Sequence, residues 1–452
     1  MDGESTAAVT AVGDGGGGDG GRGEAGMSQE VMEEERKHLK QIANSFLHYK
    51  PYVMRRVERL QRDYSSLPSA HRDMLPLYPS LLLSGICSLW RQWRGTSDFV
   101  QTIVSCAAGM FENSNFERDG GEGVAPALDF HVEKVKTTIK QFYRDWSSEG
   151  AAERDMCYKP IIDDIIRLFP PDKIPSGEVS ILVPGAGLGR LAYEIARRGY
   201  SCQGNEFSMH MLFGSHFILN CVSQPSSHTI HPWVTQFSNM MSYEDQTAPV
   251  AVPDVNPRAL PQLGLFSMTA GDFLDVYRTP DSWDCVACSF FIDTAHNIIQ
   301  YLESIYHILR PGGYWINMGP LLYHYADIPG EFSLELSWDD VLRIARDEIG
   351  FDILVTCSFL LDTGQHNNRS MCATKHEYRR GEVFPVPHTD PRILIQMTTN
   401  VYVPQLPGNR ETPHPLSTRC VNSERAHQNT PHPLPHGRYN ITQFAESKFS
   451  TL

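Results

Sequence analysis

The sequence predicts an α/β fold built on a mostly parallel, doubly wound sheet, and three observations lead to that prediction. The apolar run 181–183 ends in the glycine turn GAGLG, a helical pattern follows, and the acidic Glu206 closes the segment. Downstream, the apolar runs DCVACSFFID and YWINMGP flank a second helical pattern. Between that helix and the last run lies LRPGG, which ends a helix and turns the chain. Strands that alternate with helices in this order are typical of a parallel sheet with helices on both faces.

The chain before the glycine turn is expected to be mostly helical. Residues 1–27 are rich in Gly, Ala and Asp, and we expect them to be disordered because they carry little apolar surface to bury. Residues 28–150 place apolar side chains at helical spacing and predict a helical region. Within it we expect two helices that break near Pro51 and a further helix over 130–146. Another helix is expected around 160–168, before the Pro-rich turn.

Residues 151–360 are predicted to form the sheet domain. After the glycine turn and Glu206, we expect a helix over 209–220 and then an irregular stretch. A strand over 284–293, a helix over 298–309 and the turn LRPGG lead into the next strand. The run FDILVTCSF that begins at Phe351 adds one more strand.

The last segment, 361–452, departs from the α/β rhythm. It is polar and rich in Pro and His, and we expect a divergent, disordered tail. Only 393–403 reads as a strand within it.

Composition excludes several classes of protein. A net charge of −14 without a dense Lys/Arg stripe argues against nucleic acid as a partner. No apolar run approaches the roughly 20 residues that span a bilayer, so no membrane association is expected. The ten cysteines lack regular spacing, and the close pair Cys285 and Cys288 has no second pair to complete a zinc site. We therefore predict no metal, reduced thiols, and a location in the cytosol and nucleus.

The glycine turn by itself indicates a nucleotide-like ligand. Glycines allow close approach of the backbone to a ligand, and Glu206 can accept from ribose hydroxyls. A dinucleotide dehydrogenase places its third glycine five positions after the first, where this chain has Arg190. The pattern thus argues against NAD. Asp272, in TAGDF, is suited either to accept from an adenine amino group or to cap a helix.

Glycine turn, strand-end acid, GD and LRPGG together resemble a class I methyltransferase that uses S-adenosylmethionine. More narrowly, LVPGAGLGRLAYEIA, CQGNEFS, FSMTAGDF, FFIDTAHN and MGPLLYH resemble the carnosine N-methyltransferase family. The resemblance covers residues 28–351 apart from 78–100. It implies a Rossmann-like fold and methyl transfer to the imidazole of carnosine (β-alanyl-histidine), which gives anserine. Related His-containing peptides are implied as further substrates.

The resemblance also implies a cofactor site assembled from several motifs. KQFYRDW would contact the methionine end of the cofactor, where the planar guanidinium of Arg144 suits a carboxylate. The first glycine would lie under the cofactor, Glu206 would hold the ribose, and Asp272 and Phe273 would flank the adenine. Ser289 stands where relatives can carry Cys. The implied cofactor residues are Gln141, Arg144, Gly185, Glu206, Asp272, Phe273, Ser289 and Tyr301. A surface ion pair for Arg144 and a core position for Tyr301 are the alternatives.

Asp293 and His324 are the residues that the resemblance places at the substrate, and we expect both to be catalytic. Each follows a predicted strand at its carboxyl end, where ligands bind in such sheets. Asp293 could accept from one ring N–H of the substrate and stabilise the cation that develops on methylation. His324 could bind the peptide or relay a proton, or it could be a packed histidine at a strand end.

The C-terminal segment departs from the family. An aromatic-rich last strand that lines the family's substrate pocket has no match here, so we expect cofactor binding and turnover to be impaired if the sheet is incomplete. A cofactor-binding or dimerisation module without catalysis, and a protein or tRNA methyltransferase, are the alternative functions. We expect the N-terminal helices to form a lid or a homodimer contact.

Overall fold

A computed structural model of the protein describes residues 8–10, 29–76, 78, 96, 98–107, 129–238, 242–261, 265–362 and 392–402. Its main sheet consists of β1 (Ala8–Thr10), β2 (Ser180–Pro184), β3 (Ser201–Glu206), β6 (Phe266–Ala270), β7 (Trp283–Ser289), β8 (Leu309–Met318), β9 (Phe351–Asp362) and β10 (Arg392–Tyr402). Within the described ranges, the strand order is β1-β6-β3-β2-β7-β8-β10-β9, and every neighbouring pair is parallel. The predicted α/β fold class is confirmed.

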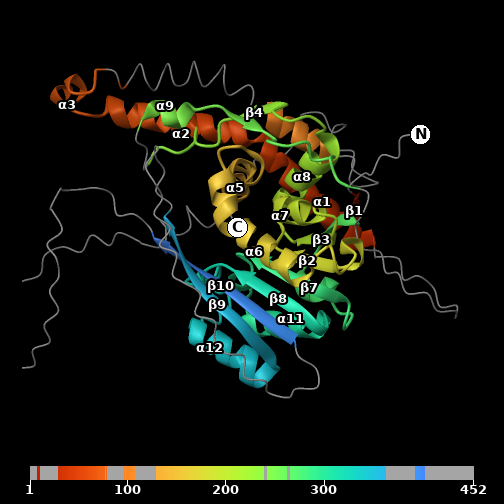
Figure 1. The fold of residues 1–452 in the computed structure, drawn as a ribbon. Helices are drawn as coiled ribbons and strands as arrows, with labels where there is room; N and C mark the ends of the chain where they lie inside the picture. The colour runs from red at the N-terminus through yellow and green to blue at the C-terminus, as the bar shows by residue number, and fades with distance from the viewer. Residues whose placement is uncertain are drawn as a thin grey trace, which may run out of the picture.

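Helices pack around the sheet, and some of them form a separate layer at one end of the molecule (Figure 1). They are α1 (Gln29–Leu47), α2 (Tyr49–Ser65), α3 (Ser69–Asp73), α5 (Asp129–Trp146), α6 (Ala151–Leu168), α7 (Arg190–Ala196), α8 (Met209–His216), α9 (Tyr243–Thr247), α10 (Phe273–Val276), α11 (Ile298–Ile308) and α12 (Trp338–Arg343). Helices α1 and α2 form a layer along the top of Figure 1, and α12 lies at the opposite end. A small antiparallel pair, β4 (His228–Ile230) and β5 (Val250–Val252), also belongs to the upper layer.

The predicted helix break falls at His48, between α1 and α2, and Pro51 lies in the first turn of α2. Proline is tolerated there because the first N–H groups of a helix have no intrahelical partner.

Two predicted boundaries differ from the structure. Strand β7 ends at Ser289 rather than 293, because Phe290 takes a positive φ of 56° and a short 3-10 helix, Ile292–Thr294, follows. The LRPGG turn does not separate α11 from β8 but forms a bulge inside the strand. The pairing with β7 passes from Leu309 directly to Tyr314, and Gly312 in between has a φ of 78°. Glycine is suited to such a bulge because it adopts positive φ without a steric penalty.

Two strands of the sheet, β1 and β10, lie in the terminal segments that were predicted to be disordered. Strand β10 confirms the strand expected at 393–403, and it lies inside the sheet, between β8 and β9. The structure therefore differs from a tail that is disordered throughout 361–452. Likewise, β1 lies within the Gly-rich segment 1–27 and pairs with β6. Both strands satisfy backbone groups that an open sheet edge would leave unpaired. The other residues of 1–27 and of 363–452 lie outside the described residues.

Helix α5 is fixed to the core by one apolar stripe. Its buried apolar side chains recur every three or four residues, as expected of a helix with one face in a core. They are Val132, Val135, Ile139, Phe142 and Trp146, all with 0% exposure. Burial of each such side chain is worth roughly 1.5–3 kcal/mol. Because this stripe holds the helix against the sheet domain, the polar residues on the neighbouring face of α5 have fixed positions.

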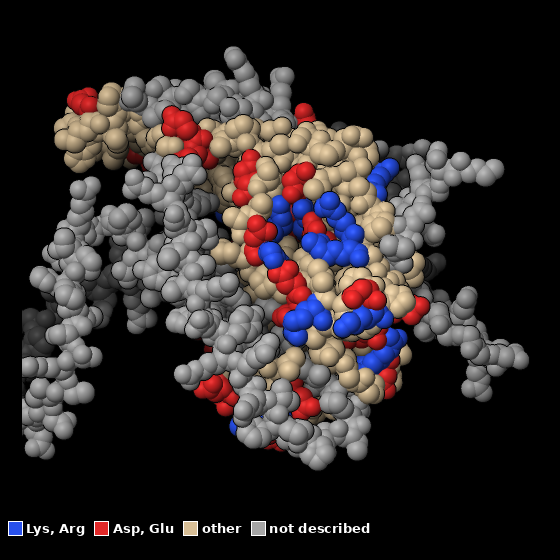
Figure 2. Space-filling view, viewed as in Figure 1, with Lys and Arg blue, Asp and Glu red and all other residues tan. Residues whose placement is uncertain are grey.

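The surface in Figure 2 mixes charges of both signs. Blue and red side chains alternate over the region where α6 and α7 lie in Figure 1. Ion pairs such as Arg167 with Asp164 and Arg198 with Glu194 account for part of this pattern. Among the described residues, no helix combines the length and apolar character needed to cross a membrane.

Candidate active site

A cavity of about 1280 Å³ opens at the carboxyl ends of the central strands. Strand β2 pairs with β3 on one side and β7 on the other, so the order of the sheet reverses direction there. Ligands bind in parallel sheets at such a switch point. Helices α1 and α5 contribute residues to the lining of the same cavity. The lid and the homodimer contact that were expected of the N-terminal helices both stay predictions.

All eight cofactor residues predicted from the sequence line this one cavity. They come from helix α5, the glycine turn, the ends of β3 and β7, the start of α10 and helix α11: Gln141, Arg144, Gly185, Glu206, Asp272, Phe273, Ser289 and Tyr301. They span 161 positions of sequence, from 141 to 301, and only the fold brings them together.

Gly185 occupies a position that no other residue fits. Its φ is 65°, and a Cβ there would lie 2.8 Å from Cδ2 of Phe291. A side chain would therefore meet both a strained backbone and a steric overlap. The glycine brings the backbone of the turn close to the cavity, as the motif implied.

Glu206 is held by the backbone around it. Its Oε2 accepts from the N–H of Gly187 at 2.8 Å, and its Oε1 accepts from the N–H of Phe207 at 2.9 Å and of Ser208 at 2.7 Å. Burial raises the pKa of Glu206, while these three hydrogen bonds and the charge of Lys134 act to lower it. A carboxylate offers about four acceptor positions, so one remains for a ligand hydroxyl.

Aromatic rings form one wall of the cavity. Tyr301 stacks on Phe291 with ring centroids 4.7 Å apart, and Phe273 meets both rings edge-on at 5.3 Å. Burial raises the pKa of Tyr301 to about 12, so its hydroxyl stays protonated. Asp272 caps α10 by accepting from the N–H of Leu274 at 2.8 Å, which confirms the helix-cap alternative. Asp272 also lines the cavity, and its contact with adenine stays a prediction.

Gln141 and Arg144 project from the last turns of α5. Arg144 forms an ion pair with Glu153 at 2.6 Å, which is the alternative that the sequence left open, but both side chains line the cavity. Gln141 donates through Nε2 to Asp145 at 3.0 Å. Its Oε1 is buried and has no hydrogen-bond partner among the described residues. A buried amide oxygen without a partner is unfavourable and is suited to a donor on a ligand.

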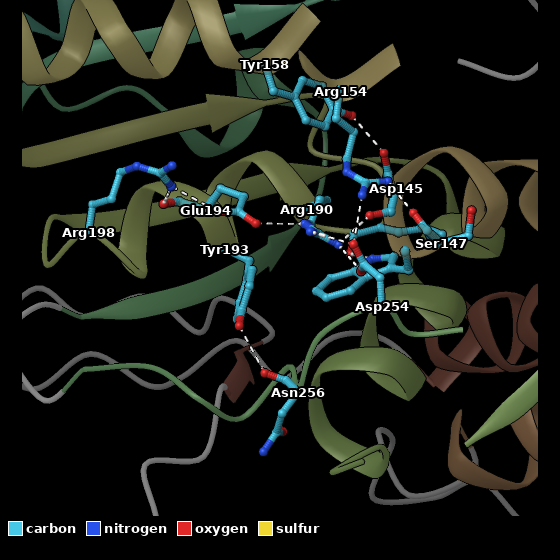
Figure 3. Close-up of polar contacts among 12 residues, drawn as sticks. Asp145, Ser147, Arg154, Tyr158, Arg190, Tyr193, Glu194, Arg198, Asp254 and Asn256 are labelled. Atoms are coloured by element: carbon cyan, nitrogen blue, oxygen red, sulfur yellow. Dashed lines mark hydrogen bonds and ion pairs between the residues drawn. The ribbon is translucent and has the colours of Figure 1, made fainter. Parts of the chain in front are cut away.

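A buried ion-pair network fixes this end of α5 (Figure 3). The carboxylate of Asp254 binds Arg154 at 2.7 Å and Arg190 at 2.5 Å, and all three side chains are at most 13% exposed. Arg190 also donates to the carbonyl of Asp145 at 2.7 Å, and its guanidinium lies 4.9 Å from the ring centre of Trp146. The residue after the glycine turn thus ties α7 to the carboxyl end of α5.

The two proposed substrate residues lie at different depths from the cavity. His324 lines the cavity, whereas Asp293 is 1% exposed and is not among the lining residues. The two are joined through the backbone, since the N–H of His324 donates to the carbonyl of Asp293 at 3.0 Å. Oδ2 of Asp293 accepts from the N–H of Leu322 at 3.0 Å. Burial raises the pKa of Asp293 and lowers that of His324, and each moderates the shift of the other.

Several buried polar atoms at the site have no hydrogen-bond partner among the described residues. They are Oε1 of Gln141, Oγ of Ser289, Oδ1 of Asp293 and Nε2 of His324. Buried polar groups in native proteins are nearly always paired, so the unpaired atoms of the three cavity-lining residues, Gln141, Ser289 and His324, indicate a place where a ligand completes the hydrogen bonding. With the glycine cradle, these atoms fit a polar nucleoside-type cofactor next to a second polar ligand. No cluster of metal-ligating side chains occurs in the described part of the chain.

A model of the carnosine N-methyltransferase family matches residues 123–380 of this chain, which is more than half of it. The chain belongs to the carnosine N-methyltransferase family. The identification from the motifs is thereby confirmed, and the family match includes every residue assigned above to the cofactor or the substrate.

Relatives from distant organisms support the assignment to this family. A carnosine N-methyltransferase of Rattus norvegicus is 46% identical over 345 residues, covering 76% of this chain and 84% of the relative. One from Schizosaccharomyces pombe is 39% identical and covers 72% of this chain and 90% of the relative. A solved complex of the Haloferax volcanii Trm112 activator with a methyltransferase shows 15% identity, a TM-score of 0.29 and coverage of 48% and 73%. The family assignment rests on the first two relatives and the family model.

For this member of the carnosine N-methyltransferase family, the sequence analysis did not predict several helix residues that line the cavity. His38, Leu39 and Ile42 of α1 and Lys134 of α5 line it as well. Lys134 lies seven residues before Gln141, which is two helical turns, so both lie on one face of α5. That spacing could have identified Lys134. No comparable pattern marks the residues of α1.

Proposed function

We propose that this chain transfers a methyl group from S-adenosylmethionine to an imidazole nitrogen of carnosine and so produces anserine. Other peptides that contain His are proposed as further substrates. The observation that carries this proposal is the convergence, in one cavity, of the eight cofactor residues with His324. Membership of the carnosine N-methyltransferase family supports it.

The continuity of the sheet supports an active enzyme. The expected impairment was conditional on an incomplete sheet, and β10 pairs with both β8 and β9. A catalytically inactive module is therefore not favoured, and the mixed charges on the face in Figure 2 give no support to a tRNA methyltransferase.

Residues of this chain can hold the cofactor in a defined way. Arg144 and Oε1 of Gln141 would take its carboxylate and amino groups, the last acceptor position of Glu206 its ribose, and Asp272 with the aromatic wall its adenine. S-adenosylmethionine supplies an electrophilic methyl group on a positively charged sulfur. The chain contributes orientation, because near-attack geometry accounts for much of the rate in such a transfer.

Asp293 and His324 would orient the substrate and manage its charge. An imidazole has a pKa near 6.5 and is mostly neutral at pH 7, so its nitrogen can attack. The buried Asp293 carboxylate favours the positive charge that develops on the methylated ring. The product ring must then lose a proton from its other nitrogen. His324 has a lowered pKa and an unpaired Nε2 at the cavity, so it is a neutral group that can accept this proton.

Titration calorimetry with each ligand added separately tests the proposal. We expect S-adenosylmethionine and carnosine each to bind, with carnosine bound more tightly once the cofactor site is filled. Binding of the cofactor alone would favour a module without this activity. An Asp293→Ala variant that keeps full turnover of carnosine would refute the role of the carboxylate.

The location of the protein in the cell is a separate proposal. Six cysteines in the described residues are free thiols, which suits a reducing compartment, and we propose the cytosol and nucleus. Cell fractionation with an antibody to the chain would test this location.

A further inference from the structure

The cavity has room for more than one ligand. Pockets for a single drug-sized ligand measure roughly 300–1,000 Å³, and this one measures about 1280 Å³. Under the proposed function it holds two ligands, the cofactor and a peptide. Each of these ligands carries one carboxylate, and a cation beside each carboxylate would strengthen its binding.

The cations of the cavity differ in their partners. Arg144 is paired with Glu153 and stands at the position implied for the cofactor carboxylate. Arg154 is held by Asp254 and also donates to the carbonyls of Arg144 and Ser147, so its guanidinium is committed to the fold. Among the Lys and Arg side chains that line the cavity within the described ranges, only Lys134 has no carboxylate within ion-pair distance.

Lys134 lines the same cavity as Glu206 and His324. Its charge acts on Glu206, at the ribose end, and on His324, at the substrate end. Its ammonium lies 5.3 Å from the ring centre of Phe130, which shields one side of it from solvent. Burial lowers the pKa of Lys134, as expected of an ammonium that has lost water and gained no close anion. A bound carboxylate would supply that anion.

We propose that Lys134 binds the carboxylate of the peptide substrate and so selects peptides that carry a free carboxylate near the histidine ring. The inference rests on the proposed function and deepens it. With the imidazole at His324 and the carboxylate at Lys134, the peptide is fixed at two points of the histidine residue. Rotation of the ring nitrogen away from the methyl group is thereby prevented.

The test compares carnosine with its C-terminal amide in the wild type and in Lys134→Met. For the wild type we expect KM for the amide to exceed that for carnosine by roughly 10- to 100-fold, the range of one hydrogen-bonded charge pair. In Lys134→Met we expect KM for carnosine to rise by a similar factor, with kcat changed little. The variant should no longer distinguish the two peptides. Lys134→Arg should restore much of the discrimination, since it keeps the charge.

Two controls distinguish binding of the peptide carboxylate by Lys134 from a general effect of removing a lysine from α5. Lys136→Met changes a lysine of the same helix that pairs with Glu133 at 3.0 Å and does not line the cavity, and it should behave as the wild type. The Kd for S-adenosylmethionine should be unchanged in Lys134→Met, which also shows that the variant is folded.

The outcomes are distinct. If Lys134→Met retains the preference for carnosine over its amide, or if it weakens cofactor binding instead, the inference is wrong while the proposed function stands. If the wild type fails to methylate carnosine at all, the proposed function itself is wrong, and the inference fails with it.

Discussion

At the scale of single residues, Asp293 is a buried carboxyl group with incomplete hydrogen bonding in the described part of the chain, which is unfavourable for the stability of the fold. Asp293 is 1% exposed, with one oxygen bound to a backbone N–H and the other without a partner in the described residues. A buried charged group with an unpaired atom lowers the free energy of unfolding. Burial raises its pKa, so the folded state keeps a proton on Asp293 at pH values where the unfolded chain has lost it.

Replacement of this carboxylate should make the fold more stable and the enzyme less active. We expect Asp293→Asn to raise the free energy of unfolding by about 1 kcal/mol at neutral pH and to lower kcat by roughly 10²- to 10³-fold. Thermal unfolding and initial rates with carnosine measure the two effects. Asp275→Asn, at an exposed ion pair with Arg278, is the matched control and should change neither.

The stability gain should depend on pH with a defined sign. In the wild type, the raised pKa favours the folded state below the ordinary value of 3.8, and this contribution is lost as pH rises through the folded-state pKa. The advantage of Asp293→Asn should therefore be largest at neutral pH and shrink on acidification. An advantage that grows on acidification would show that the carboxylate is stabilised by the fold.

At the scale of elements, the site depends on how α5 is held against the glycine turn. Asp254 pairs with two guanidinium groups, Arg154 on α6 and Arg190 at the start of α7 (Figure 3). Arg190 also donates to the backbone carbonyl of Asp145 in the last turn of α5. Removal of one partner from a buried pair leaves an uncompensated charge. The positions of Gln141 and Arg144 therefore rest on a residue outside the cavity.

Asp254→Asn should destabilise the fold and weaken cofactor binding together. We expect a loss of about 3–5 kcal/mol in the free energy of unfolding and a higher Kd for S-adenosylmethionine, measured by denaturant titration and calorimetry. Asp163→Asn removes an exposed ion pair with Lys159 on α6 and should cost about 0–1 kcal/mol. Equal effects of the two substitutions would contradict the role given to the network.

The cofactor residues could be predicted from the sequence because their motifs are local. Gly185 and Asp272 lie at predicted strand ends, and Glu206 closes the segment that begins at the glycine turn. The partner of Arg190 could not be predicted, since Asp254 is 64 positions away in an irregular stretch. That His324 lines the cavity and Asp293 does not could not be predicted either, because a strand-end pattern does not indicate which side chain reaches the cavity.

At the scale of the whole molecule, a strand from beyond the family match completes the sheet. The family model ends at residue 380, and β10 lies at Arg392–Tyr402, paired with β9 along its length and with β8 from Ile393 to Met397. Without β10 both neighbours would expose backbone N–H and C=O groups. The sequence predicted the strand from its apolar pattern but gave no register, because strand pairing between distant segments is set by the fold.

Truncation tests the place of β10 in the sheet. A chain that ends at residue 391 should yield less monomeric protein and unfold less cooperatively than a chain that ends at 403, which keeps the strand. Size-exclusion chromatography and denaturant titration measure the difference. Equal behaviour of the two chains would show that β10 does not contribute to the stability of the sheet.

The central claim is that the cavity between the glycine turn and His324 methylates the imidazole of carnosine. The most direct measurement is incubation of the purified full chain with S-adenosylmethionine that carries a labelled methyl group and with carnosine, followed by NMR of the product. We predict the label on a ring nitrogen, as in anserine, with turnover lost in Asp293→Asn. A labelled product methylated elsewhere, or no labelled carnosine although both ligands bind, would contradict this claim.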